Sequence, residues 1–72
     1  MDSKTKLQEW SQLKFKKIPL YRVISRTGPS HHPVFVVEVL VVNGQKSLGK
    51  GNSKREAKYN AATSFLKKYL ST

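Results

Sequence analysis

The sequence predicts an α+β fold with the element order α-β-β-β-α, in which a three-stranded antiparallel sheet carries both helices on one face. Three observations favour it. The run Val34–Val42 is almost wholly β-branched or aromatic, which is typical of a strand. It leads into Asn43-Gly44, a dipeptide preferred in hairpin turns whose two central residues both need positive φ. Ser53 and Glu56 form a capping box that opens a helical pattern.

The length of 72 residues allows one domain, because two separate cores would each fall below the roughly 40 residues needed for unaided folding. The chain has no cysteine, so its core forms without disulfides or thiolate-bound metal. No apolar run approaches the roughly 18 residues that cross a bilayer, and the opening residues do not form an apolar signal core. We expect a soluble cytoplasmic module with an N-terminal tail of residues 1–3, a domain of residues 4–70 and a C-terminal tail of residues 71–72.

The first helix is expected from Thr5 to about Leu13, with Leu7 and Trp10 facing inward. A first strand is expected over Leu20–Thr27, because proline precedes it and Gly-Pro follows it.

The central strand should span Val34–Val42, and the third strand should return over Gln45–Lys50. Residues of the central strand alternate between the two faces of the sheet. The core face should therefore hold Phe35, Val37, Val39 and Val41.

The second helix is expected to start after Ser53 and to end near Leu70. Apolar residues recur along it at a spacing that suits packing on a sheet. This stripe consists of Ala57, Ala61, Ala62, Phe65, Leu66 and Tyr69.

The charge balance indicates an anionic partner. Lys and Arg number 14 and Asp and Glu number 4, giving a formal net charge of +10. Such an excess destabilises the compact state by self-repulsion, and nucleic acid is the commonest reason for it. An anionic membrane surface or an acidic protein is the alternative. The acidic side chains are scattered too far apart for a metal-binding carboxylate cluster: Asp2, Glu9, Glu38 and Glu56.

Three cations gather in the first turns of the second helix: Lys54, Arg55 and Lys58. The helix dipole disfavours cations there by roughly 0.3–1 kcal/mol each, so the cluster points to an external anion, phosphate above all. The alternative is an ordinary solvated face of a lysine-rich protein. Lys67 and Lys68, at the other end of the helix, complement the dipole and need no such explanation.

The outward stripe of the first helix carries amides, a hydroxyl and a carboxylate rather than cations: Thr5, Gln8, Glu9 and Gln12. These groups suit the shallow minor groove of A-form RNA, whose 2′-hydroxyls both donate and accept hydrogen bonds. An ordinary polar helix face is the alternative.

The segment Gly28–Pro33 has a proline near each end and His31 in the middle. Prolines reduce the entropy that a loop loses on binding, and an imidazole can donate or accept a hydrogen bond in a groove. Metal binding by His31 and His32 is disfavoured, because no cysteine and few carboxylates could complete the site.

The outer face of the sheet mixes charges and aliphatics, with Arg22, Ile24 and Arg26 expected on the first strand and Val36, Glu38 and Leu40 on the second. We expect a solvated face with a cross-strand Arg–Glu pair. A contact patch for another domain or subunit is the alternative.

These pieces resemble the double-stranded-RNA-binding domain over residues 4–70. The motifs that carry the resemblance are Thr5–Glu9, Pro19–Tyr21, Gly28–Val39 and Gly49–Lys58. The resemblance implies three RNA-contacting regions: the first helix in one minor groove, the His31 loop in the next, and the start of the second helix across the intervening phosphates, over about 16 base pairs. The implied RNA-binding residues are Thr5, Gln8, Glu9, Gln12, Gly28, Pro29, His31, Ser53, Lys54, Arg55 and Lys58.

Within that family, Asp2–Trp10 is most similar to the opening of the C-terminal domain of bacterial ribonuclease III. This implies an excised or separately encoded module that binds RNA without cleaving it. Mg²⁺ would belong to the catalytic domain alone, and this chain would hold no cofactor. The isolated domain would be monomeric and the parent endoribonuclease, an RNA-processing enzyme, homodimeric. Arg55 departs from the lysine often found at that position.

Two alternatives remain: a stand-alone double-stranded-RNA-binding protein, and a module of the same fold that mediates protein interaction or dimerisation. RNA-recognition motifs and KH domains fit less well, because the sequence lacks their aromatic RNP1-type and Gly-x-x-Gly signatures.

Overall fold

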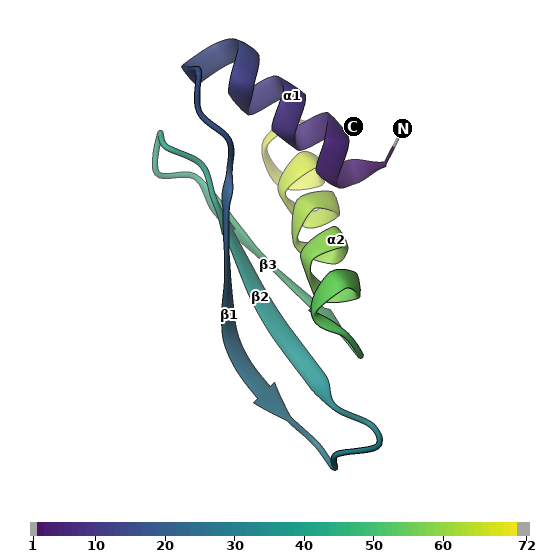
Figure 1. Ribbon diagram of the computed structural model, residues 1–72. Coiled ribbons are helices and arrows are strands. Elements are labelled where there is room, and N and C mark those ends of the chain that lie inside the picture. The colour runs from purple at the N-terminus through teal and green to yellow at the C-terminus, as the bar shows by residue number, and fades with distance from the viewer. Residues whose placement is uncertain (1, 71–72) are drawn as a thin grey trace.

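The computed structural model describes residues 2–70 and confirms the predicted α+β order. The elements are α1 (Ser3–Phe15), β1 (Leu20–Thr27), β2 (Val34–Leu40), β3 (Lys46–Gly51), α2 (Lys54–Phe65) and a π-helical turn over Leu66–Leu70. Figure 1 shows the two helices together on one side of the sheet. The expected tail of residues 71–72, and residue 1 of the expected N-terminal tail, lie outside the described residues.

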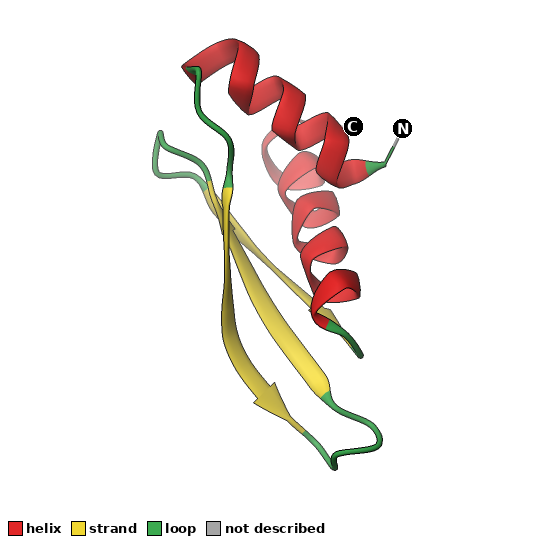
Figure 2. Ribbon diagram, viewed as in Figure 1, coloured by secondary structure: helices red, strands yellow, loops and turns green. Residues whose placement is uncertain are grey.

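The sheet has the strand order β1-β2-β3, with both pairs antiparallel. Helix α2 lies over β3 and β2, and α1 packs against α2 (Figure 2). This leaves the outer face of the sheet without a helix, as the alternating pattern of β2 predicts.

The core forms between α2 and the sheet. As predicted, the inward residues of β2 and most of the apolar stripe of α2 are buried, together with Leu7 from α1. The ring of Trp10 lies 5.6 Å from that of Phe15 and 5.9 Å from that of Phe65, so α1 is held by aromatic contacts. The buried apolar residues are Leu7, Phe35, Val37, Val39, Val41, Ala57, Ala61, Ala62, Phe65 and Leu66.

Helix α1 is longer than predicted at both ends. Asp2 caps its start, since the Asp2 carboxylate accepts a hydrogen bond from the backbone N–H of Thr5 at 2.8 Å. At its end Lys16 has φ 60° and donates its N–H to the Gln12 carbonyl at 2.9 Å. The hydroxyl of the buried Ser11 then donates to the Lys17 carbonyl at 2.5 Å, which fixes the connection toward β1.

The turn between β2 and β3 differs from the prediction. Gly44 has φ 94°, but Asn43 does not have a positive φ, so the expected two-residue turn is wrong. The Gly44 N–H bonds to the Val41 carbonyl and the Val41 N–H bonds to the Gln45 carbonyl, both at 2.9 Å. These bonds define a three-residue loop with glycine in the left-handed position. The flanking strands therefore end at Leu40 and start at Lys46.

Strand β1 contains a bulge that the sequence reading missed. Arg22 pairs with Glu38, but beyond the bulge at Ile24 it is Arg26 that pairs with Phe35. One extra residue shifts every later side chain to the opposite face. The expectation that Arg26 shares the outer face with Arg22 is therefore wrong.

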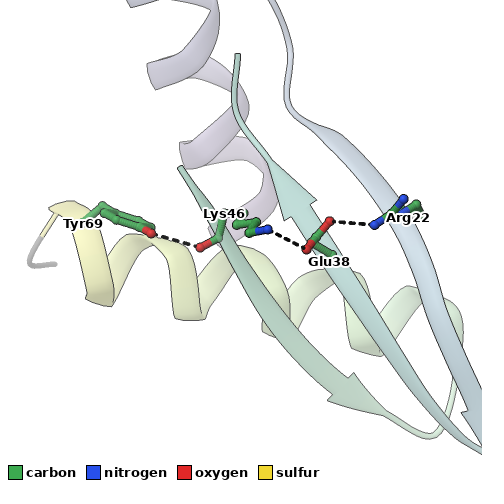
Figure 3. A network of polar contacts seen from close by, with 4 residues as sticks. All are labelled: Arg22, Glu38, Lys46 and Tyr69. Atoms are coloured by element: carbon green, nitrogen blue, oxygen red, sulfur yellow. Dashed lines mark hydrogen bonds and ion pairs between the residues drawn. The ribbon is translucent and has the colours of Figure 1, made fainter. Parts of the chain in front are cut away.

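The outer face carries the predicted Arg–Glu pair. Figure 3 shows the Glu38 carboxylate between Arg22, at 3.3 Å, and Lys46, at 3.9 Å. The Tyr69 hydroxyl donates to the Lys46 carbonyl at 3.1 Å, which joins the π-helical turn to the start of β3.

The second helix reaches Leu70 as expected, but its last turn is π-helical rather than α-helical. Within residues 2–70, no helix has the length and apolar character needed to span a membrane.

Candidate nucleic-acid interface

The polar stripe of α1 is exposed along its full length. Thr5 and Gln8 line a hollow that is also lined by Ser53, which caps α2, and by Arg55 and Tyr59 of α2. Gln8 also lines a second depression, together with Glu9, Gln12 and Leu13. The Thr63 hydroxyl donates to the Ser3 hydroxyl at 2.6 Å and ties the two helices together beside the hollow. Groups from α1 and α2 that are about 50 residues apart in sequence thus face the same open space.

The start of α2 presents the three predicted cations to solvent. Lys54 and Arg55 are exposed and Lys58 is half-buried. Among residues 2–70 the ion pairs involve Arg22 and Lys46, and none involves these three side chains. Their charge, added to the positive end of the α2 dipole, creates a positive potential at this end of the helix.

The capping box at Ser53 is formed in part. The Ser53 hydroxyl accepts the Glu56 N–H at 3.0 Å, as predicted. The Glu56 carboxylate, however, accepts the N–H of Asn52 at 2.9 Å instead of that of Ser53. The carboxylate thus fixes the residue that leads into the helix.

The loop between β1 and β2 has a backbone that requires glycine at its start. Gly28 has φ 84°, and a Cβ there would lie 2.7 Å from the His32 carbonyl oxygen. The His32 N–H donates to the Pro29 carbonyl at 2.9 Å and closes a turn around His31. Both imidazoles are exposed, with ring centroids 5.4 Å apart.

A hydrogen bond that sequence reading missed joins this loop to α2. The Asn52 side chain donates to the Pro33 carbonyl at 3.0 Å. The segment before α2 is thus tied on one side to the β1–β2 loop and on the other to Glu56 of the helix. No local pattern signals such a bond, because its two partners are 19 residues apart.

The three regions are spread along one elongated side of the molecule. The longest dimension is 40 Å. Helix α1 lies at one end and the β1–β2 loop at the other, and the start of α2 lies between them (Figure 1). This arrangement suits a long, regularly charged ligand better than a compact one.

Two groups, Asp2 at the start of α1 and Tyr21 of β1, have shifted pKa values. The Thr5 N–H lowers the pKa of the exposed Asp2 carboxyl, because it hydrogen-bonds to the charged form. Burial raises the pKa of Tyr21 to about 12, and the charge of Asp2 adds a smaller effect in the same direction. The Tyr21 hydroxyl is buried without a hydrogen-bond partner among the described residues.

Tyr21→Phe should flatten the pH dependence of stability in the alkaline range. A tyrosine in an unfolded chain titrates near 10, so the folded state holds this proton more tightly. The stabilisation is complete below pH 10 and is lost as the pH rises through about 12. Chemical denaturation of both proteins across this range measures the effect. An equal slope of stability against pH in the two proteins would contradict it.

No group of three or more histidine, aspartate and glutamate side chains within residues 2–70 is arranged to hold a metal ion. What the described surface offers is hydrogen-bonding groups and cations.

Comparison with known proteins gives consistent matches. The family model described as "Double-stranded RNA binding motif" matches residues 3–69. Ribonuclease 3 of Caulobacter vibrioides (strain NA1000 / CB15N) is 48% identical over 67 residues, covering 93% of this chain and 29% of the relative. Ribonuclease 3 of Bartonella quintana (strain Toulouse) is 46% identical over 67 residues, covering 93% and 28%. The chain thus spans less than a third of the length of these relatives.

Among solved structures, the solution structure of DRB4 dsRBD2 matches with a TM-score of 0.61 and 31% sequence identity. The match covers 88% of this chain and 87% of that one. The similarity therefore extends over nearly the whole fold.

Proposed function

Because the chain belongs to the double-stranded RNA-binding motif family, we propose that it binds A-form double-stranded RNA by shape, through minor-groove contacts and a Lys/Arg phosphate clamp. One observation carries the proposal: α1, the β1–β2 loop and the start of α2 lie along one side of the molecule, and polar side chains of α1 line the same hollow as Ser53 and Arg55. An A-form duplex offers two successive minor grooves separated by major-groove phosphates, which is the same order of polar, charged and polar surfaces.

Helix α1 is proposed to enter one minor groove. Its exposed side chains Thr5, Gln8, Glu9 and Gln12 can exchange hydrogen bonds with 2′-hydroxyls. A carboxylate such as Glu9 is repelled by phosphate but can accept a hydrogen bond from a ribose hydroxyl, so its presence favours a groove position.

The β1–β2 loop is proposed to enter the next minor groove. Gly28 provides the left-handed backbone at the start of the loop. The hydrogen bond from the His32 N–H to the Pro29 carbonyl closes the turn and places His31 at its tip. A loop that is preorganised before binding loses less conformational entropy on binding than a mobile loop. The bond from Asn52 to Pro33 fixes this loop relative to α2.

The start of α2 is proposed to clamp phosphates across the major groove. Lys54, Arg55 and Lys58 displace counterions from the RNA, and Ser53 begins the helix whose positive dipole end faces them. Binding of this kind carries little sequence information, because phosphate contacts position a duplex without reading it.

The chain is proposed to serve as the substrate-binding module of a ribonuclease III endoribonuclease, without catalysis of its own. The identity to Ribonuclease 3 of two bacteria over 67 residues supports this assignment. Mg²⁺ would then act in the catalytic domain of the whole enzyme. We propose a monomeric isolated domain and a homodimeric whole enzyme.

A second candidate, an association module of the same fold, is favoured by one observation. The outer face of the sheet exposes large aliphatic side chains, among them Leu20, Leu40 and Leu48. Leu20 and Leu40 pair across β1 and β2, and exposed apolar surface of this kind marks some protein contacts. An association module would form dimers whose population depends on protein concentration and does not depend on RNA.

The proposed function predicts that the chain binds RNA duplexes of about 16 base pairs in preference to B-DNA duplexes of equal length. DNA lacks the 2′-hydroxyls and presents grooves of different width. Titration of both duplexes at one fixed salt concentration measures the preference, with sedimentation to report dimers. Equal affinity for the two duplexes, or dimers that bind neither, would contradict the proposal.

A further inference from the structure

The bulge in β1 turns an arginine toward the side of the sheet that carries the helices. Past Ile24, Arg26 pairs with Phe35, and residues paired across antiparallel strands point to the same face. Phe35 points into the core beneath α2, so Arg26 projects on the helix side. Helix α2 lies over β2 and β3, so Arg26 on β1 stays exposed.

The guanidinium of Arg26 packs over the ring of Phe35. The central carbon of the guanidinium lies 5.6 Å from the ring centroid. A cation–π contact of this kind restricts the side chain while leaving its outer N–H groups available. Within residues 2–70, Glu38 takes Arg22 and Lys46 as ion-pair partners, and no carboxylate pairs with Arg26.

The position of Arg26 lies between two of the proposed RNA-binding regions. Gly28, two residues after Arg26 in the sequence, begins the β1–β2 loop. Across the sheet, Phe35 pairs with Arg26 on one side and with Gly51 on the other. Gly51 leads directly to Asn52 and to the start of α2, so one row across the sheet runs from Arg26 toward the phosphate clamp.

We propose that Arg26 is an RNA contact outside the three regions described above, which binds a backbone phosphate at the border between the minor groove of the β1–β2 loop and the adjoining major groove. Phe35 serves as the platform that orients it. A planar guanidinium suits this role because it can bind two phosphate oxygens at once. The inference rests on the proposed function and adds a residue to its binding surface.

Arg22 provides a matched control, because it lies on the same strand but on the outer face, paired with Glu38 (Figure 3). Arg26→Gln and Arg22→Gln each remove one positive charge. Both should be titrated with a 16-base-pair RNA duplex from about 50 to 200 mM salt. Arg26→Gln should lower the log-log salt slope by about one unit. The factor by which affinity falls between the two salt concentrations should then be about fourfold smaller than for the parent. Arg22→Gln should keep the parent slope.

A second variant tests the platform. Arg26→Lys keeps the charge but loses the planar group that stacks on Phe35 and binds bidentately. Its salt slope should equal that of the parent, and its affinity should fall between those of the parent and Arg26→Gln. An affinity equal to that of the parent would overturn the role of the platform.

The outcomes separate this inference from the proposed function. Failure of the parent chain to bind duplex RNA would overturn both. Binding by the parent with equal slopes in Arg26→Gln and Arg22→Gln would overturn the role of Arg26 alone. Circular dichroism and melting temperature confirm that each variant is folded.

Discussion

Replacing Lys54, Arg55 and Lys58 together with alanine is expected to lower the log-log salt slope of RNA binding by roughly two to three units. Each side chain that neutralises a phosphate releases condensed counterions, and each lost contact removes about one unit of slope. Their lack of ion pairs within the described chain means that no internal partner competes with RNA for them. Titration of a 16-base-pair duplex from about 50 to 200 mM salt measures the change.

Gln8 and His31, which are proposed to enter the minor grooves, provide the control for this prediction. Gln8→Ala and His31→Ala should each weaken binding by about 1 kcal/mol at an unchanged slope, because they remove hydrogen bonds and no full charge. The triple variant should keep the melting temperature of the parent. The substitutions remove cationic side chains from the positive end of the α2 dipole, and alanine has a high helix propensity. A folded triple variant with the parent slope would show that α2 is not the phosphate clamp.

Gly49→Ala is expected to destabilise the fold by about 3 kcal/mol, because it separates α2 from β3. A Cβ at Gly49 would lie 2.1 Å from the backbone nitrogen of Ala61 and 2.6 Å from the carbonyl oxygen of Ala57. These are backbone atoms, so no side-chain rotation relieves the clash. For a domain of this size the loss corresponds to a fall in melting temperature of roughly 12–24 °C. Thermal unfolding followed by circular dichroism measures it.

Gly44→Ala is the matched control for Gly49→Ala, because it changes a glycine in the same hairpin. No atom lies within 4 Å of a Cβ at Gly44, and its φ of 94° imposes only the local cost of a left-handed residue, about 1–2 kcal/mol. If Gly49→Ala lowers the melting temperature no more than Gly44→Ala, the close contact of α2 with β3 is not what stabilises the fold.

The sequence predicted the elements whose signals are local. Ser53 caps α2 as its hydroxyl indicated, and the alternation of Phe35 and Val37 marked the buried face of β2. Such signals are readable because helix caps and strand alternation depend on neighbouring residues. The outward position of Gln8 followed from the helical spacing of the polar residues in α1.

The features that the sequence did not reveal depend on long-range contacts. Val23 and Ile24 are both aliphatic, so nothing in their order marks the bulge that turns Arg26 to the helix side. The bond from Asn52 to Pro33 joins two loops that meet only in the folded chain. Asn43-Gly44 did predict a turn, but loop length and strand register decided its type.

We expect α1, the β1–β2 loop and the start of α2 to bind one RNA duplex together. Amide chemical shifts of the labelled chain, followed during titration with a 16-base-pair RNA duplex, test it most directly. The amide signals of Gln8, His31 and Lys54 should shift with a single shared dissociation constant, while those of Leu40 and Leu48 on the outer face should stay unchanged. Shifts centred on Leu40 and Leu48, or separate dissociation constants for the three regions, would contradict it.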